Sequence, residues 1–229
     1  MKLSGRDASR FLAKPAGAAA ILLHGSDPMR VALKRQALTL ALVGEAGVAE
    51  MRLTRLSAAD LRRDPAALLD AVKATGFFPG PRAILVEEAG DGVAPLLATA
   101  LADWRDGDAV VVVAAGALGK GSALRKVCET ARTAVAIAIY DDPPGRDEIL
   151  ATLATAGLAP PPGPAMADLE ALSRSLDPGD FAQFIEKLAL YKRGDAAPLS
   201  PEDIAAIAPP PPEAELDRLI ELAAEGNPG

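Results

Sequence analysis

Residues 109–115 read AVVVVAA, and this run of four consecutive valines between alanines decides the fold class. β-Branched side chains lose little freedom in an extended chain, and a strand that is apolar at every position is typical of a parallel sheet buried on both faces. Residues 18–23 (AAAILL) and 134–139 (AVAIAI) have the same character. We therefore predict a parallel sheet with helices on both faces.

Amphipathic segments alternate with the apolar runs over the first 140 residues, as expected for strand–helix–strand units. Asp27 and Pro28 predict the cap and the first position of a helix that runs to Val43. A strand with imperfect alternation is expected at 51–56, near a sheet edge, and another strand at 82–86. Further helices are expected from Ser57 through Val72 and over 93–104 and 118–131.

The cluster YDDPP at 140–144 predicts a domain boundary, because no valine-rich run follows it. Helical patterns follow at 146–157, 165–175, 178–192 and 200–207, with proline tracts as stiff spacers. We expect an α/β domain over residues 1–142 and a small all-α domain over 143–209. Residues 210–229 contain one more amphipathic segment with no predicted partner, which indicates the start of a truncated helical domain.

Composition excludes several classes of protein. Of the 229 residues half are apolar, and the net charge of −7 argues against a sequence-independent DNA-binding module that uses an overall basic surface. One cysteine and one histidine exclude a disulfide framework, a Cys-rich zinc site and a two-His metal motif. The sequence lacks a membrane span and a signal-peptide core, so we expect a cytoplasmic protein without membrane contact.

Two segments stand where a nucleotide-binding loop would be expected, and neither has the required residues. Residues 24–30 (HGSDPMR) contain one glycine and no lysine, whereas a working loop needs G-x-x-x-x-G-K-[ST]. Residues 116–122 (GALGKGS) contain Lys120 but have the wrong glycine spacing. We assign no catalytic residue, no metal and no cofactor. The alternative interpretation is an NTPase with a non-standard nucleotide site.

Two adjacent phenylalanines, Phe77 and Phe78, lie in the segment GFFPGP at 76–81. Neighbouring residues in an extended segment point to opposite sides, so one ring is expected to face outward when the other joins the core. An exposed ring forfeits about 1.5–3 kcal/mol of burial, so it would suit a partner's pocket. Burial of both rings between sheet and helices is the other interpretation.

Four segments of the chain carry a family resemblance: AILLHGSDP (20–28), KATGFFPGPR (73–82), LGKGSALRKVCE (118–129), and FIEKLALY (184–191) with LSPED (199–203). Together they resemble the delta subunit of the bacterial DNA polymerase III clamp loader, particularly of the alphaproteobacterial type. AILLHGSDP looks like that family's strand one with a non-functional P-loop, and KATGFFPGPR occupies the place of its clamp-binding element. LGKGSALRKVCE is similar to its strand-four-to-helix passage, and FIEKLALY with LSPED is similar to its helical-domain signature.

The resemblance implies an AAA+-like α/β domain with a degenerate P-loop, followed by a helical lid. It also implies a non-catalytic subunit of the replicative DNA polymerase holoenzyme, a nucleotidyltransferase complex, that binds and opens the sliding clamp without hydrolysing ATP. Phe77 and Phe78 would insert into the clamp, with Lys73, Gly76 and Pro79 completing the element. Lys73 departs from the family's preferred glutamine and Phe77 from its preferred aliphatic residue.

The resemblance further implies contacts with other clamp-loader subunits and with DNA. The subunits would assemble through a helical collar, of which residues 210–229 resemble only the start. We therefore expect this chain to bind the clamp without assembling stably with other loader subunits. DNA would be contacted only within the assembled loader, and Lys120, Arg125 and Lys126 are the candidates for contact with DNA or a neighbouring subunit.

Overall fold

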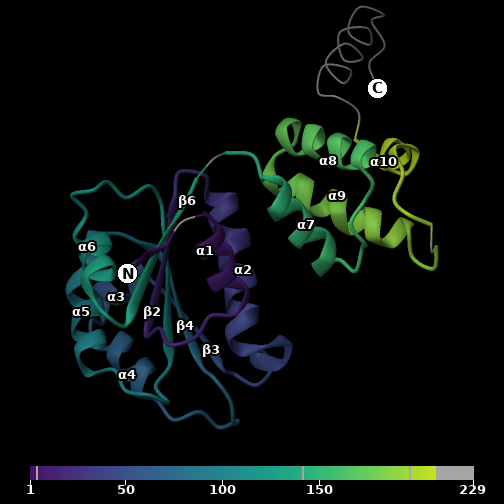
Figure 1. Cartoon of the computed structure of the whole chain (residues 1–229). Helices are drawn as coiled ribbons and strands as arrows, with labels where there is room; N and C mark the ends of the chain where they lie inside the picture. The colour runs from purple at the N-terminus through teal and green to yellow at the C-terminus, as the bar shows by residue number, and fades with distance from the viewer. Residues whose placement is uncertain (4, 141, 196, 210–229) are drawn as a thin grey trace, which may run out of the picture. The chain divides into compact units, whose positions relative to one another are not determined.

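The computed structural model of the chain describes residues 1–3, 5–140, 142–195 and 197–209 (Figure 1). The chain divides into two compact units, Met1–Asp142 and Pro143–Gly229. The segment 210–229, where the sequence indicates the start of a further helical domain, lies outside the described residues.

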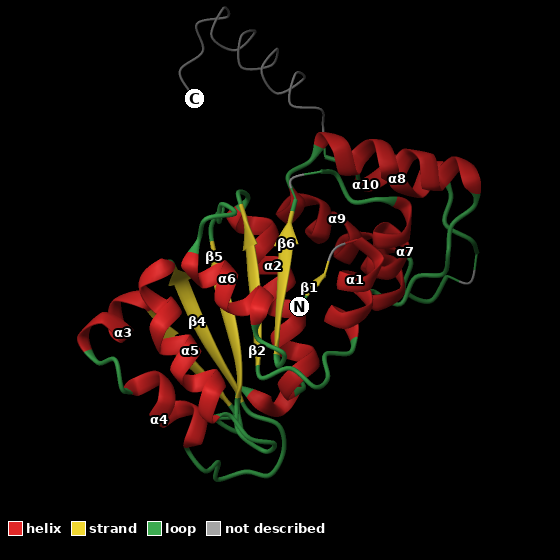
Figure 2. Ribbon diagram, turned by 60° about the vertical axis from the view of Figure 1, so that its left-hand side comes forward, coloured by secondary structure: helices red, strands yellow, loops and turns green. Residues whose placement is uncertain are grey.

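One six-stranded sheet forms the centre of the first unit, in the order β1-β6-β2-β5-β4-β3, and every pair of neighbours is parallel (Figure 2). The predicted parallel sheet is therefore confirmed. The valine strand β5 lies between β2 and β4, with Val112 opposite Ile21 and Leu85. The strands are β1 (Lys2–Leu3), β2 (Ala20–Gly25), β3 (Leu53–Ser57), β4 (Ala83–Ala89), β5 (Val110–Ala115) and β6 (Ala134–Ile139).

Helices cover both faces of this sheet, as predicted (Figures 1 and 2). Val112 and Val113 point to opposite faces because successive side chains of a strand alternate. On the Val112 side the core includes helical residues such as Leu38, and on the Val113 side it includes Leu97 and Leu124. The first face carries α1 (Gly5–Ala13) and α2 (Pro28–Val43), and the second carries α3 (Ala58–Arg63), α4 (Ala67–Lys73), α5 (Ala94–Asp103) and α6 (Ala123–Thr130).

The continuous helix predicted from Ser57 is wrong, because α3 ends at Arg63 and α4 begins only at Ala67. Ser57 caps α3 as expected, in a capping box with Asp60. The break falls at Asp64, whose φ of −132° is outside the helical range. Pro65 follows it, and the residue before a proline avoids the helical conformation for steric reasons.

The helix predicted from residue 118 also begins later than expected, at Ala123. Ser122 is its N-cap, and the Ser122 hydroxyl accepts a hydrogen bond from the Arg125 amide at 3.2 Å. Asp91 fixes this start from another part of the chain, because its carboxylate accepts hydrogen bonds from the Ser122 hydroxyl at 2.5 Å and the Leu124 amide at 3.1 Å. Such a cap is a tertiary contact that helical periodicity does not reveal.

The second unit contains four helices around one hydrophobic core within the described residues, close to the predicted ranges. Phe184 and Leu188 of one helix are buried in this core. The Lys192 ammonium lies 3.2 Å from the Asp203 carboxylate and also bonds Asp195, so it joins the last two of these helices. The helices are α7 (Arg146–Thr155), α8 (Gly163–Ser175), α9 (Pro178–Tyr191) and α10 (Pro201–Ile207). None of the helices in the described ranges is long and apolar enough to cross a membrane.

Candidate functional site

The N-terminus of α2 follows β2 directly, where a nucleotide-binding fold would hold phosphate. Here the Asp27 carboxylate accepts hydrogen bonds from the amides of Met29, at 2.8 Å, and Arg30, at 3.1 Å. The Arg30 guanidinium pairs with the same carboxylate at 3.3 Å. An added Cβ at Gly25 would lie 2.5 Å from the Ile139 carbonyl oxygen, so only glycine fits at the end of β2 beside β6. An anion would therefore compete with a carboxylate of the chain itself.

The loop 74–82 joins α4 to β4 at the N-terminal ends of the strands, whereas α2 begins at their C-terminal ends (Figure 1). This separation follows from the parallel sheet, because the loop enters a strand whereas the α2 N-terminus follows one. Any function of the loop is therefore physically separate from the N-terminus of α2.

Phe77 is 89% exposed, and Phe78 is half-buried. The two rings meet edge to face, with centroids 5.2 Å apart and planes at 77°. The fully buried alternative considered for this pair is not the observed arrangement, because Phe77 faces solvent. The loop thus presents an aromatic side chain that the first unit does not use for its core.

Two arginines hold this loop at its ends. Arg82 donates hydrogen bonds to the carbonyl oxygens of Ala74 and, at 3.2 Å, Gly107. Arg52 donates to the Pro81 carbonyl oxygen at 3.0 Å and pairs with a glutamate. A Cβ at Gly76 would lie 2.9 Å from the Arg82 side chain, so glycine allows this close approach. The local sequence does not reveal this role of either arginine, because it does not distinguish a guanidinium that bonds a loop carbonyl oxygen from a solvated one.

Lys73 lies at the start of this loop, and its ammonium bonds within the chain. It lies 2.8 Å from the Asp108 carboxylate and 3.1 Å from that of Asp103. The hydrogen bond with Asp108 raises the pKa of Lys73. Lys73 therefore joins α4 to the end of α5, and Gly76, Phe77, Phe78 and Pro79 follow it in the loop 74–82.

The three basic residues that are candidates for contact with DNA or a neighbouring subunit, Lys120, Arg125 and Lys126, lie apart from this loop, on or just before α6. Lys120 and Lys126 are exposed. Arg125 is half-buried, pairs with Glu129 at 2.8 Å and donates to the Leu118 carbonyl oxygen at 3.3 Å. Of the three, the two lysines present ammonium groups to solvent, whereas Arg125 stabilises the start of α6.

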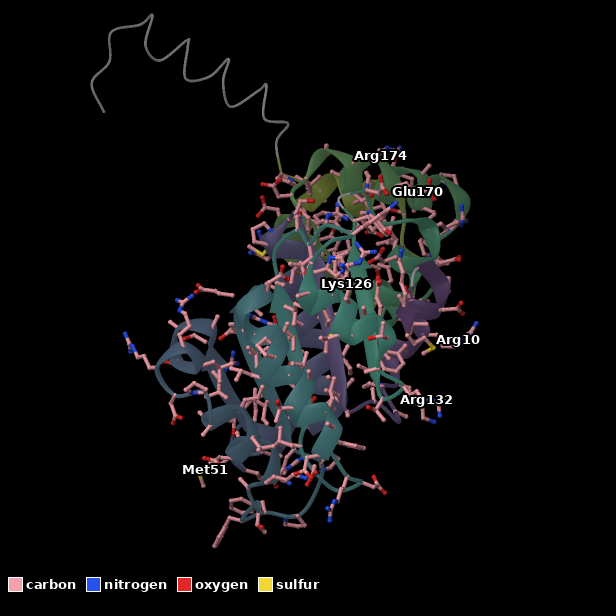
Figure 3. The ribbon with its side chains drawn as sticks, turned by 90° about the vertical axis from the view of Figure 1, so that its left-hand side faces the viewer. Arg10, Met51, Lys126, Arg132, Glu170 and Arg174 are labelled. Atoms are coloured by element: carbon pink, nitrogen blue, oxygen red, sulfur yellow. The ribbon has the colours of Figure 1, made fainter. Side chains whose placement is uncertain are left out.

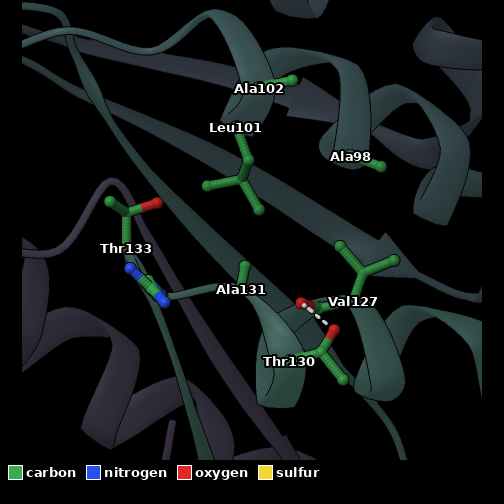
Figure 4. A pocket seen from close by; sticks show the side chains of 8 residues that line it. Ala98, Leu101, Ala102, Val127, Thr130, Ala131 and Thr133 are labelled. Carbon is green, nitrogen blue, oxygen red and sulfur yellow. Dashed lines mark hydrogen bonds between the residues drawn. The ribbon is translucent and has the colours of Figure 1, made fainter.

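A shallow hollow of about 380 Å³ lies between α5 and α6 (Figure 4). Leu101 and Val127 contribute apolar surface to it, and its lining carries a single charged residue, Arg132. Across the described ranges no group of three or more His, Cys, Asp or Glu residues is placed to hold a metal. The residues that line the hollow offer no arrangement of acid, base and nucleophile.

Cys128 and His24 are both buried. Burial raises the pKa of the Cys128 thiol to about 12, so it remains protonated near neutral pH and acts as a small apolar residue. Burial, helped by the positive charge of Arg125, lowers the pKa of His24 below its usual 6.5. Neither residue has the exposure that a catalytic role requires.

The lowered pKa of His24 predicts a specific loss of stability in mild acid. As pH falls through 6.5, the unfolded chain binds a proton at His24 before the folded chain does, so the free energy of unfolding decreases until the folded pKa is also passed. Urea unfolding at about pH 7.5 and about pH 5.5, followed by the fluorescence of Trp104, the single tryptophan, measures this. A His24→Asn variant should lose less stability over this interval, and an equal loss in both proteins would contradict the prediction.

No protein-family model matches the sequence, and comparison with curated proteins found no significant match. Among solved structures, the Bacillus subtilis DNA clamp loader delta protein (YqeN) matches with a TM-score of 0.61 at 16% identity, over 88% of this chain and 61% of that one. A point variant of Thermotoga maritima RuvB gives 0.43 at 12% identity, over 87% of this chain and 64% of that one. Domain III of the Thermotoga maritima replication initiation protein DnaA gives 0.39 at 11%, over 88% of each chain.

The first of these similarities is strong enough to identify the fold, and this chain spans about three fifths of the length of that clamp loader protein. The predicted α/β fold, a parallel sheet covered by helices, is confirmed by the strand order and by this similarity. The chain has the fold of a clamp loader delta protein over most of its length.

Proposed function

We propose that this chain binds a ring-shaped sliding clamp through the loop 74–82, as a clamp-loader delta-like subunit that does not itself hydrolyse ATP. The observation that carries the proposal is the 89% exposure of Phe77 on a loop held at its ends by Arg52 and Arg82. The fold shared with the Bacillus subtilis clamp loader delta protein supports it.

A held aromatic pair is physically suited to insertion into a protein pocket. A phenylalanine buries about 150–250 Å² when it is fully enclosed, and few interface residues contribute more binding energy than a central aromatic anchor. The bonds from Arg52 and Arg82 reduce the ordering entropy that binding would otherwise cost. On this proposal, Gly76 and Pro79 shape the loop, and Lys73 positions it by anchoring α4.

Clamp opening would follow if the aromatic pair enters the clamp at one of its subunit interfaces and holds that interface apart, so that DNA can enter the ring. The test is a titration of the purified sliding clamp, from the organism that encodes the chain, with the wild-type chain. Saturable binding that requires Phe77 and Phe78 is expected. A chain that does not bind the clamp would contradict the proposal.

The remaining parts of the chain have corresponding roles in this proposal. Residues 143–209 would be the helical lid, and the segment 210–229 would begin the collar that joins other loader subunits. Lys120 and Lys126 would contact DNA or a neighbouring subunit only in the assembled loader, and their exposure supports this assignment. Arg125 would act indirectly, by holding the turn before α6 through the Leu118 carbonyl oxygen.

The alternative of an NTPase with a non-standard site leads to a separate prediction. We expect no heat of binding when millimolar Mg-ATP is titrated into the chain, because the Asp27 carboxylate already bonds two amides at the α2 N-terminus and repels phosphate. Isothermal titration calorimetry measures this directly. Saturable heat that disappears in a Lys120→Ala variant would contradict the prediction and support the nucleotide enzyme.

A further inference from the structure

Two exposed apolar side chains, Val48 and Met51, lie in the turn that connects α2 to β3. Val48 is 65% exposed and Met51 is 72% exposed. The turn leads into β3, and β3 pairs in parallel with β4. The turn therefore lies at the N-terminal ends of the strands, as the loop 74–82 does. Figure 3 shows Met51 at the lower end of the first unit.

Met51 has an unfavourable backbone conformation in addition to its exposure. Its φ is 53°, in the left-handed region that glycine and asparagine tolerate better than methionine. The turn is held there because the Met51 amide donates to the Val48 carbonyl oxygen at 3.1 Å and the Arg52 amide donates to that of Gly47 at 2.8 Å. Neither the backbone nor the core of the isolated chain benefits from a methionine at this position.

Arg52 joins this turn to the loop 74–82. Its side chain is largely buried, it pairs with Glu50 at 2.7 Å, and it donates to the Pro81 carbonyl oxygen at 3.0 Å. Gly80, with a φ of 120°, lets the guanidinium approach to 3.2 Å from the position of its missing Cβ. The Ala83 amide also donates to the Arg52 carbonyl oxygen at 2.9 Å. Turn and loop are therefore held as one surface.

The aromatic pair alone is too small for a stable protein interface. Two fully buried rings supply at most about 500 Å², whereas a standard interface buries about 800 Å² on each partner. Further contact area must therefore come from residues next to the pair. Val48 and Met51 are exposed apolar residues at the same N-terminal ends of the strands as the loop 74–82, on a turn that is bonded to the loop through Arg52.

We propose that Val48 and Met51 form a second apolar contact with the same clamp that receives Phe77 and Phe78. This inference rests on the function proposed above. The second contact would lie on apolar clamp surface beside the pocket for the rings, at a spacing fixed by the bond from Arg52 to Pro81. Met51 is 72% exposed, so its side chain faces solvent and does not pack on the sheet.

The test uses Met51→Asn, because asparagine tolerates a positive φ and removes the apolar contact. We expect this variant to bind the clamp about 3- to 10-fold more weakly in surface plasmon resonance, while its thermal unfolding midpoint stays the same or rises. Affinity thus falls without any loss of stability, a combination that loss of folding would not produce. Met29→Gln is the matched control, because Met29 is 50% exposed at the C-terminal ends of the strands, away from the loop 74–82. This variant should leave the affinity for the clamp unchanged.

The double variant Phe77→Ala, Phe78→Ala separates this inference from the proposed function. If Met51→Asn binds the clamp like the wild-type chain while the double phenylalanine variant does not, the second contact is overturned and the proposed function stands. If the wild-type chain binds no clamp, both fail. Sedimentation velocity of the chain alone gives a further check, because a dimer that Met51→Asn dissociates would assign the surface to a second copy and overturn the inference.

Discussion

Replacement of both Phe77 and Phe78 by alanine is expected to remove most of the affinity for the sliding clamp and to leave the fold almost unchanged. Central aromatic anchors typically contribute about 2 kcal/mol each, so a loss of about 4 kcal/mol is expected, which corresponds to roughly 1000-fold in Kd. Thermal stability should change little because Phe77 is 89% exposed and Phe78 only half-buried. Surface plasmon resonance against immobilised clamp and a thermal melt of the same samples measure both quantities.

Leu40→Ala is the matched control for this experiment. Leu40 is an apolar residue of α2 that is 51% exposed, so its truncation removes a similar kind of surface away from the loop. Its affinity for the clamp should equal that of the wild-type chain. Unchanged clamp affinity in the double phenylalanine variant would contradict the proposed function, whereas a parallel loss of stability would show that the rings serve the fold.

The opposite behaviour is expected for Leu22→Ala. Leu22 is fully buried in β2, where it lies opposite Val113 of β5 and Ala136 of β6. Removal of a buried leucine side chain costs about 2–5 kcal/mol, because the cavity closes only in part. The free energy of unfolding, measured by urea titration and Trp104 fluorescence, should fall by this amount.

Clamp affinity of Leu22→Ala should remain near that of the wild-type chain at a temperature where the variant is folded. Leu22 lies inside the sheet, and the loop 74–82 is held by Arg52 and Arg82 rather than by contacts with Leu22. Leu40→Ala again serves as the control, with little change in stability. A loss below about 1 kcal/mol for Leu22→Ala would contradict the central position of β2 in the core.

Much of the fold could be predicted from the sequence because three of its strands, β2, β5 and β6, consist largely of continuous apolar runs. β6 has the predicted bounds, and β5 begins one residue after the predicted start. β1 could not be predicted, since a strand this short carries no hydrophobic period, and it forms by pairing with β6. The late start of α6 depends on Asp91, which is distant in sequence from the Ser122 hydroxyl whose hydrogen bond it accepts.

The candidate site was predictable in its residues but not in its geometry. Adjacent aromatics between glycine and proline mark Phe77 and Phe78 in the sequence, whereas their exposure depends on how the loop meets the sheet. Lys73 also stands out in the motif, yet its ammonium bonds Asp103 and Asp108, a contact between α4 and the end of α5 that the local sequence does not reveal.

The sequence by itself determined the parallel sheet, its covering helices, the unsuitable nucleotide loop and the aromatic pair, because each depends on residue types close together along the chain. Only the tertiary structure decided that Arg52 and Arg82 hold the loop 74–82, and that Val48 and Met51 lie beside it at the N-terminal ends of the strands. The bond from Arg52 to the Pro81 carbonyl oxygen joins residues that are far apart in sequence and that meet only when β3 and β4 pair. Long-range pairing of this kind has no local periodicity, so it becomes visible only in the folded chain.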